Sequence, residues 1–293
     1  MRKPDFFFLG GPKCGTTALA AYLSDHPLIQ MASPKEPHYF CTDLKAGGIP
    51  VKSDEDYINT FFPGLEDSKK VSAGDSSVWY LYSTVAVERI LKFRSDAKFI
   101  VFVRNPSSMA YSLHSMLVFQ GQETEENLVE AWRMQKERAQ GRSIPKGLWL
   151  DTAMLQYKMV CSLGTQLERV YQQVQRERVH VILQEELYRN TMQTYERVLE
   201  FLGVPTDGRL FFPKLNAARR FRSPSIAKLL RTKLAIGTAS VIKSSLGLKT
   251  LGVGRPELPM ERYVATFLSS EFEREVEKLE GLLHRDLSCW REK

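Results

Sequence analysis

Apolar and polar positions are arranged along this chain in a way that predicts strands and helices in turn. Mostly apolar runs lie within residues 5–9, 98–103 and 178–183, and the third of them contains His180. Such runs are typical of strands buried on both faces, as in a parallel sheet covered by helices. The pattern therefore predicts an α/β fold with a central parallel sheet flanked by helices.

Between and after these runs, apolar residues recur with helical spacing. The last such stripe consists of Phe272, Val276, Leu279 and Leu283, at positions i, i+4, i+7 and i+11. No internal repeat or low-complexity linker interrupts the pattern, so we expect one domain across residues 1–293. The predicted helices are 16–24, one that starts near 107, 123–140, 165–176, 194–202 and one across the terminal stripe.

Composition narrows the class of protein. The chain has 293 residues, of which 43% are apolar and 26% are charged, as in ordinary globular proteins. No apolar stretch approaches the roughly 20 residues that span a bilayer, and the first residues do not resemble a secretory signal peptide. Four widely spaced cysteines without a C-x-x-C pair argue against a disulfide framework or a zinc site, so we expect a reducing, cytoplasmic setting.

Positive charge is concentrated in one segment. The net charge is +7, and residues 214–255 contain ten Lys or Arg and no Asp or Glu. A local positive field of this kind favours an anionic ligand, an anionic substrate or a membrane surface, although a solvated basic face is the simpler alternative. We expect residues 222–255 to form a basic, partly mobile lid, and the amphipathic stretch 226–234 leaves peripheral membrane contact open.

The first apolar run leads into the motif GGPKCGTT, residues 10–17, directly before a predicted helix. A strand, a glycine-rich turn and a helix N-terminus together form an anion site, because backbone N–H groups and the helix dipole point at the ligand. The glycines allow the backbone to approach the ligand closely, and the two threonines supply hydroxyls. The motif predicts a phosphate cradle made by Gly11, Pro12, Lys13, Cys14, Gly15, Thr16 and Thr17.

The motif departs from the nucleotide-binding P-loop at one position. Thr16 stands where that loop has a lysine, and the lysine of this loop is Lys13. The second predicted strand ends in Arg104 rather than in an acidic residue that holds magnesium. These differences favour a nucleotide bound without metal. A P-loop kinase or NTPase is one alternative, and a protein that binds nucleic acid or anionic membranes through residues 214–255 is another.

Taken together, the motifs resemble those of the sulfotransferases that use 3′-phosphoadenosine 5′-phosphosulfate (PAPS). The loop GGPKCGTTAL is similar to that family's 5′-phosphosulfate loop, VFVRNPSSMAYS to its 3′-phosphate motif, and KEPHYF (35–40) to a segment of heparan-type and bacterial members. LNAARRFRSPS and VEKLEGLLHRDLSCW also resemble segments of bacterial members. The resemblance implies a P-loop-like three-layer fold and sulfuryl transfer to a hydroxyl without metal, leaving 3′-phosphoadenosine 5′-phosphate (PAP).

For the donor, the resemblance implies that Lys13 contacts the bridging oxygen of the phosphosulfate, where it would stabilise the leaving group. It implies that Arg104 and Ser112, eight residues later, bind the 3′-phosphate, which suits the bidentate geometry of a guanidinium group. Arg219 and Arg222 fall in one of the later segments, and we expect them to close over the nucleotide.

For proton transfer, the resemblance points to Glu36 as the general base, with a structural ion pair to a nearby lysine as the alternative. His38 is the second candidate, although a partly buried histidine bonded to the backbone is the simpler interpretation. Lys35 would add positive charge near the sulfuryl group, or be solvated. The nearby positions of the three residues in KEPHYF predict that they lie together.

The segment AGDSSVWYL is the expected acceptor wall. The resemblance places Asp75, Ser76 and Trp79 there, with a turn cap as the alternative for Asp75 and core packing for Trp79. Heparan-type enzymes have a lysine where this chain has Ser76, which argues against a highly charged polysaccharide. We expect a small-molecule, sugar or lipid acceptor and no nucleic acid, and the sequence leaves the oligomeric state open.

Overall fold

The computed structural model describes residues 1–213 and 260–291. Its centre is a five-stranded sheet with the order β2-β3-β1-β4-β5, and every neighbouring pair of strands is parallel. The predicted parallel sheet is confirmed, whereas the expected lid at 222–255 lies outside the described residues. The strands are β1 (Phe6–Gly10), β2 (Ile29–Met31), β3 (Ser72–Asp75), β4 (Lys98–Val103) and β5 (Val179–Leu183).

The helices of the described ranges are distributed along the whole chain. They are α1 (Thr16–Ser24), α2 (Asp54–Phe61), α3 (Ala86–Phe93), α4 (Pro106–Gln120), α5 (Leu128–Arg133), α6 (Gln135–Ala139), α7 (Tyr157–Cys161), α8 (Leu163–Tyr171), α9 (Gln184–Arg189), α10 (Thr191–Leu202) and α13 (Arg262–Leu283). Short 3-10 turns are η1 (Thr152–Leu155), η2 (Arg176–Arg178) and η3 (Ser288–Trp290).

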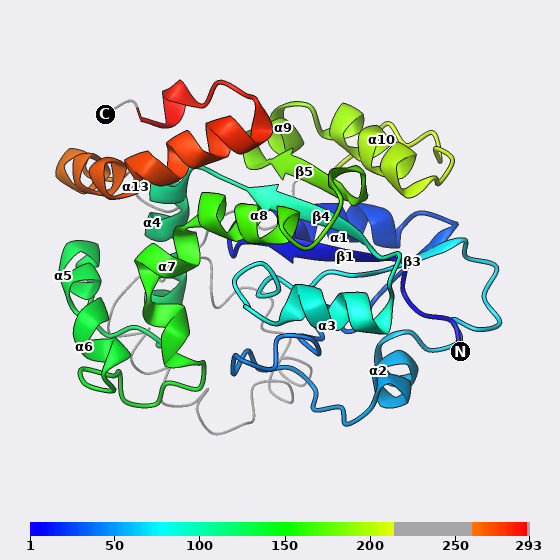
Figure 1. Ribbon diagram of the computed structural model, residues 1–293, viewed down its shortest axis with the longest axis horizontal. Coiled ribbons are helices and arrows are strands. Elements are labelled where there is room, and N and C mark those ends of the chain that lie inside the picture. Colours follow the sequence, from blue (N-terminus) through cyan, green and yellow to red (C-terminus); the bar gives the residue numbers. More distant parts are fainter. Residues whose placement is uncertain (214–259, 292–293) are drawn as a thin grey trace, which may run out of the picture.

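Helices cover both faces of the sheet, which gives the predicted three layers. Figure 1 shows α8 on one face of the sheet and α1 on the other. The C-terminal helix α13 packs against α8 and α4. The C-terminal part of the chain therefore covers helices that come from the middle of the sequence. Within residues 1–213 and 260–291, no helix has the length and hydropathy that a bilayer crossing requires.

Three of the predicted helices differ from the structure, and one of them, the expected helix 194–202, begins three residues earlier, at Thr191. The expected helix 123–140 is wrong in its first part, because 121–127 is a loop and α5 begins only after it. Glu123 turns inward, is 0% exposed and accepts the N–H groups of the next two residues, which helix geometry would not allow. Asn127 then caps α5 by accepting the N–H groups of its first turn. The expected helix 165–176 begins two residues earlier and ends at Tyr171.

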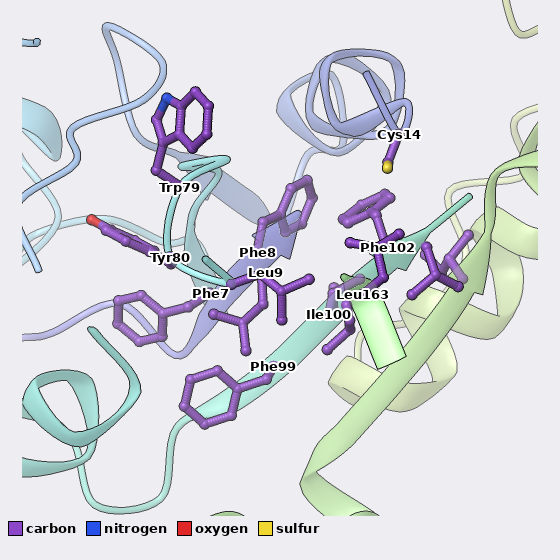
Figure 2. Close-up of a cluster of buried hydrophobic side chains, with 14 of the residues drawn as sticks. Phe7, Phe8, Leu9, Cys14, Trp79, Tyr80, Phe99, Ile100, Phe102 and Leu163 are labelled. Atoms are coloured by element: carbon purple, nitrogen blue, oxygen red, sulfur yellow. The ribbon is translucent and has the colours of Figure 1, made fainter. Parts of the chain in front are cut away.

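The core lies on both faces of β1 and β4. Phe6, Phe7 and Phe8 of β1 are all 0% exposed, and Figure 2 shows rings from β1 and β4 packed together. Phe8 and Phe102 have ring centroids 4.8 Å apart. Full burial of such a side chain contributes about 1.5–3 kcal/mol, so the phenylalanine run is a major source of stability. It also fixes where β1 ends and the glycine loop begins.

The strand order places that loop at a switch point of the sheet. From β1 the chain continues toward β2 at one edge, and from β4 it continues toward β5 at the other edge. A crevice therefore opens between the carboxyl ends of β1 and β4, the place where open α/β sheets bind their ligands. The glycine loop follows β1 and Arg104 follows β4, so both reach this crevice.

Candidate active site

A cavity of about 430 Å³ occupies the crevice. Segments from distant parts of the sequence meet in it: the glycine loop, the loop that contains Glu36, the turn after β3, helix α4, the segment before η1 and helix α9. The described residues that line it are Pro12, Lys13, Gly15, Thr16, Thr17, Ala18, Glu36, His38, Ala46, Val78, Trp79, Arg104, Ser112, Met116, Gln120, Trp149, Leu150, Gln184 and Tyr188.

The glycine loop is held open by contacts to its backbone. Lys13 has a φ of +70° and Gly15 a φ of +95°, both in the left-handed region. The carbonyl of Lys13 accepts hydrogen bonds from Arg104 Nη1 at 3.1 Å and from Gln184 Nε2 at 2.6 Å. Among the described residues no side chain caps α1; the N–H of Ala18 donates to the carbonyl of Gly15 at 3.0 Å, and a helix N-terminus without a side-chain cap is suited to an anion.

Two members of the predicted cradle contribute backbone only. Cys14 is 0% exposed, and its Sγ lies 3.8 Å from Met109 Sδ in the core. Burial raises the pKa of the Cys14 thiol to about 12, so the side chain stays neutral and packs. A Cβ on Gly11 would lie 2.8 Å from Met109 Cε, so a larger residue there would require the end of the Met109 side chain to shift. The predicted place of Cys14 in the cradle therefore concerns its backbone and stays a prediction, because its side chain is buried in the core.

Arg104 and Ser112 meet at the cavity because the start of α4 is fixed. Asn105 caps the helix by accepting the N–H groups of Ser107 at 2.9 Å and Ser108 at 3.2 Å. Its amide Nδ2 donates to the carbonyl of Trp290 at 3.0 Å, which ties the C-terminal segment to this corner. Ser112 lies about two helical turns into α4, so the repeat of 3.6 residues brings its side chain to the cavity that Arg104 also lines.

The loop 35–38 brings three charged or titratable side chains together. The Lys35 ammonium group contacts Glu36 Oε1, and His38 Nε2 lies 3.4 Å from Glu36 Oε2. Burial alone would raise the pKa of Glu36, but hydrogen bonds from His38 and Lys35 and the Lys35 charge outweigh burial and lower it to about 2. The ion pair considered as an alternative for Glu36 is therefore present, although Glu36 also lines the cavity.

Two residues of this loop, Glu36 and His38, also have a strained backbone conformation. Glu36 has a φ of +65° and His38 a φ of +55°, and neither is glycine. A residue in this region costs about 1–2 kcal/mol, so the surrounding structure must hold it there. The side chain of His38 is 6% exposed, and its Nδ1 has no hydrogen-bond partner among the described residues. Strain and an unsatisfied ring nitrogen at a cavity wall point to function.

Asp75 positions the loop 35–38 through hydrogen bonds and does not line the cavity. The predicted contact between Asp75 and the acceptor is therefore wrong. Asp75 is 0% exposed, and its Oδ2 accepts the hydroxyls of Tyr57 and Tyr80, each at 2.8 Å. Its Oδ1 accepts the N–H of Ser77 at 2.9 Å and the hydroxyl of Ser77 at 2.7 Å. Ser77 Oγ in turn accepts the backbone N–H of His38 at 3.0 Å. Asp75 is thus a turn cap that positions His38.

Three further predicted residues have mixed outcomes. Ser76 is 0% exposed and lies outside the lining, as does Lys35, which acts on the cavity through Glu36. Trp79 is 5% exposed and lines the cavity, and Figure 2 shows its indole pointing away from Phe7. Arg219 and Arg222 lie outside the described residues.

Sequence reasoning missed several lining residues. Gln184 and Tyr188 belong to α9, directly after β5, and the rule that ligands gather at the carboxyl ends of strands would have found them. Met116 lies one helical turn after Ser112 on α4 and was therefore also accessible. Trp149 and Leu150 come from an irregular segment and had no signal. Within 1–213 and 260–291, no group of three or more His, Cys, Asp or Glu is placed to hold a metal ion.

Comparison with known proteins gives one family throughout. The family model described as the sulfotransferase domain matches residues 3–211. The solved structure of a sulfotransferase from Alicyclobacillus acidocaldarius is 26% identical, covers 100% of both chains and superposes with a TM-score of 0.72. A sulfotransferase domain from the curacin biosynthetic pathway is 20% identical, covers 96% of this chain and 99% of its own, and has a TM-score of 0.51, which supports the fold alone.

Curated relatives match over a shorter stretch. The membrane-associated sulfotransferase kil1 of Dictyostelium discoideum is 32% identical over 111 residues, which is 37% of this chain and 22% of that protein. Carbohydrate sulfotransferase 15 of Mus musculus is 28% identical over 148 residues, which is 37% of this chain and 26% of that protein. The matched stretch thus spans about a quarter or less of the length of these relatives.

Proposed function

The chain belongs to the sulfotransferase domain family, and from that membership we propose that it transfers the sulfuryl group of PAPS to a hydroxyl of its acceptor. One observation carries the proposal: Lys13, Arg104, Ser112 and Glu36, which are far apart in the sequence, line a single cavity. That cavity lies where α/β sheets bind nucleotides. The residues that the resemblance assigns to donor and acceptor thus share one site.

The donor half of the site provides positive charge and N–H groups. Lys13 and the first turn of α1 are placed to stabilise the charge that develops on the leaving phosphate. Removing one such donor typically lowers the rate by about 10²–10³. Arg104 already donates one N–H to the carbonyl of Lys13, and the other N–H groups of its guanidinium suit a 3′-phosphate. Ser112 adds a hydroxyl beside it.

In the proposed step the acceptor oxygen attacks sulfur in line with the bond from sulfur to the bridging oxygen. That bond breaks, its electron pair leaves with PAP, and the hydroxyl proton passes to Glu36. Because the pKa of Glu36 is about 2, its carboxylate is ionised yet weakly basic while Lys35 contacts it. An acceptor that displaces Lys35 would make Glu36 more basic, because the contact with Lys35 is one of the causes that lower its pKa.

Other predictions from the sequence remain predictions. They are a cytoplasmic location, a single domain over 1–293 and peripheral membrane contact. The kinase or NTPase alternative is less well supported, because Thr16 and Arg104 stand where a magnesium-dependent nucleotide site has lysine and a carboxylate. The acceptor remains a small molecule, a sugar or a lipid, and the relative named as a carbohydrate sulfotransferase makes a sugar one candidate.

Calorimetric titration with PAP in the absence of magnesium tests the proposal directly. We expect wild-type protein to bind PAP and Arg104→Ala to bind it about 100-fold more weakly, since a buried charged contact is lost. Arg133→Ala is the matched control, because Arg133 pairs with Glu130 on the surface and lies outside the cavity lining. Binding of ATP with magnesium, without binding of PAP, would instead support the kinase alternative.

A further inference from the structure

Residues 284–291 form a short segment after α13 that the proposed function does not use. The segment begins at His284, whose φ of +52° ends the helix and turns the chain back. Figure 1 shows it running beside α9, to which it is also bonded. Its 3-10 turn η3 ends in Trp290, which is 5% exposed. A tryptophan buried to this extent needs a hydrogen-bond partner for its indole N–H.

Trp290 finds its polar partners at the starts of two helices that border the donor half of the cavity. Its indole Nε1 donates to Glu185 Oε1 at 2.5 Å, and Glu185 belongs to the first turn of α9. Its backbone carbonyl accepts from Asn105 Nδ2 at 3.0 Å, and Asn105 caps α4. A hydrogen bond to a carboxylate is roughly twice as strong as one between neutral groups. Trp290 therefore joins the start of α4 to the start of α9.

Each of these two partners is the chain neighbour of a residue that holds the glycine loop. Asn105 comes directly after Arg104. In the same way, Glu185 comes directly after Gln184. The side chains of Arg104 and Gln184 both donate to the carbonyl of Lys13, at 3.1 and 2.6 Å. Two short paths therefore lead from η3 to one carbonyl oxygen of the loop, one through the start of α4 and one through the start of α9.

The peptide group that these paths reach determines the shape of the glycine loop. Lys13 has a φ of +70°, a conformation that a residue other than glycine keeps only when its surroundings hold it there. The carbonyl of Lys13 receives the two side-chain hydrogen bonds, and the N–H of the same peptide, from Cys14, donates to the carbonyl of Gly11 at 3.3 Å. The turn therefore keeps its shape only while this peptide is held on both sides.

The segment 284–291 is bonded to its surroundings at further points. Arg285 Nη1 donates to Glu186 Oε1 at 2.5 Å, so the segment contacts two adjacent glutamates of α9. The N–H of Leu287 donates to Glu280 Oε1 at 2.8 Å, which ties the segment to α13. Because the segment connects α13 to the start of α9, a movement of the segment would move Glu185 and the residue before it.

Building on the proposed function, we propose that Trp290 is a positioning residue of the donor site. By holding the starts of α4 and α9, it keeps the hydrogen bonds of Arg104 and Gln184 on the carbonyl of Lys13, and so keeps the loop in the shape that receives the 5′-phosphate. Trp290 does not line the cavity, so it acts through these residues and not on the donor itself. By linkage, a change that loosens Trp290 weakens PAP binding, and PAP stabilises the bound segment by the same factor.

Trp290→Phe tests the proposal, because it keeps a buried ring and removes the indole N–H. We expect this variant to bind PAP about tenfold more weakly in calorimetric titration without magnesium, within the usual range of coupling between two sites. Glu185→Leu should have the same effect. The double variant should bind no more weakly than either single variant, because all three remove one hydrogen bond. Glu185→Gln keeps an acceptor oxygen for the indole and should stay within about threefold of the wild type.

Amide hydrogen exchange supplies a second measurement, one that a purely structural role would not change. The N–H groups of Leu287 and Trp290 are both hydrogen-bonded, so their exchange reports the opening of the segment. Saturating PAP should slow their exchange about tenfold in the wild type, because linkage makes the two effects equal. In Trp290→Phe, PAP should no longer slow exchange at Leu287. Exchange that PAP leaves unchanged in the wild type would show that the segment is not coupled to the donor site.

Trp132→Phe is the matched control. Trp132 is 8% exposed, packs edge to face on Phe272 of α13 and lies outside the cavity lining, so its replacement should lower the free energy of unfolding and leave PAP affinity unchanged. If Trp290→Phe also loses stability but binds PAP as the wild type does, Trp290 is a core residue only and the proposal is wrong, whereas the proposed function stands. If the wild type itself does not bind PAP, the proposed function fails and the positioning role fails with it.

Discussion

Two clusters in this molecule pair a glutamate with a cation, and they differ in how completely the groups are satisfied. Glu123 and Arg138 have side chains 0% and 1% exposed, joined by two hydrogen bonds of 2.5 and 2.9 Å. Tyr157 donates to the same carboxylate at 2.7 Å. Glu36, by contrast, has a side chain 34% exposed and contacts Lys35 and His38 from a backbone of positive φ.

The difference separates a structural pair from a functional one. Burial would raise the pKa of Glu123, but hydrogen bonds from Arg138, from the backbone and from Tyr157 lower it. All of those partners are internal, so nothing in the cluster is left for a ligand. At Glu36 the partners lie at a cavity wall, and His38 keeps an unsatisfied Nδ1. Complete satisfaction indicates a role in stability, and incomplete satisfaction under strain indicates a role in binding or catalysis.

The largest expected effect comes from breaking the buried cluster. Arg138→Ala leaves the Glu123 carboxylate buried and without its cation, which typically costs about 3–5 kcal/mol of unfolding free energy. Denaturant unfolding followed by circular dichroism measures this loss. The double variant Glu123→Gln/Arg138→Met is the control, and it should recover part of the stability, because no buried charge remains and the amide oxygen can still accept from Tyr157 or the backbone. A loss below about 1 kcal/mol for Arg138→Ala would show that the pair is not structural.

The second effect concerns rate rather than stability. Glu36→Gln removes the proposed proton acceptor, so we expect kcat for sulfuryl transfer to fall by about 10²–10⁴. The affinity for PAP should remain unchanged, because Glu36 belongs to the acceptor half of the cavity. Steady-state kinetics with PAPS, together with calorimetry of PAP binding, measures both quantities.

Glu130→Gln is the matched control for this substitution. Glu130 also pairs with a cation, Arg133, but it does so on the surface and outside the cavity lining. Its kcat should equal that of the wild type. If Glu36→Gln retains wild-type kcat while His38→Asn loses it, the proton goes to the histidine and the assignment of Glu36 is wrong.

The smallest effect is a pH dependence of stability. The folded-state pKa of Glu36, about 2, lies below the unfolded value of about 4.3. The ionised pair therefore stabilises the folded state above the unfolded pKa, and this contribution is lost as the pH falls from about 5 to about 2. Solvent screening keeps it below about 1 kcal/mol.

The measurement is the difference in unfolding free energy between wild type and Glu36→Gln across that pH range. We expect the difference to shrink as the pH falls. A difference that is constant between pH 5 and 2 would mean that the Lys35–Glu36 contact contributes nothing to stability.

Much of the fold could be predicted because its strands are buried on both faces. The run at β1 has no polar residue and that at β4 has only Lys98, at its first position, so both read as buried strands; α1 was predicted with its observed bounds. By contrast, β2 and β3 were missed, since Ile29–Met31 and Ser72–Asp75 are short and β3 contains a glycine and two polar residues. Gly74 is there because β3 passes over the ring of Phe6, a contact that no local pattern reveals.

The part of the site that could be predicted is the part whose motifs contain phosphate-binding residue types at a characteristic spacing. The loop and the strand end indicated Lys13 and Arg104, and the resemblance to the family's motifs added Ser112; all three line the cavity. Asp75 was misplaced, since a carboxylate after a strand is equally suited to a ligand and to the hydroxyls of Tyr57 and Tyr80. Only the packing of three segments around it decided between these roles.

The sequence by itself determined the sheet core, the glycine loop and the residues proposed to bind the donor, because each depends on neighbours close in the chain. The tertiary structure alone decided that Glu123 has all its hydrogen-bond partners in the protein interior and that Glu36 lies at a cavity wall on a strained backbone. This outcome depends on partners such as Arg138 and Lys35 and on the exposure of each pair. It also decided which residues share the cavity, because Trp149 and Trp79 are 70 residues apart and line it together only in the folded chain. Short motifs can be recognised from neighbouring residues in the sequence. The burial of charged groups and the contacts between distant segments arise only when the chain is folded.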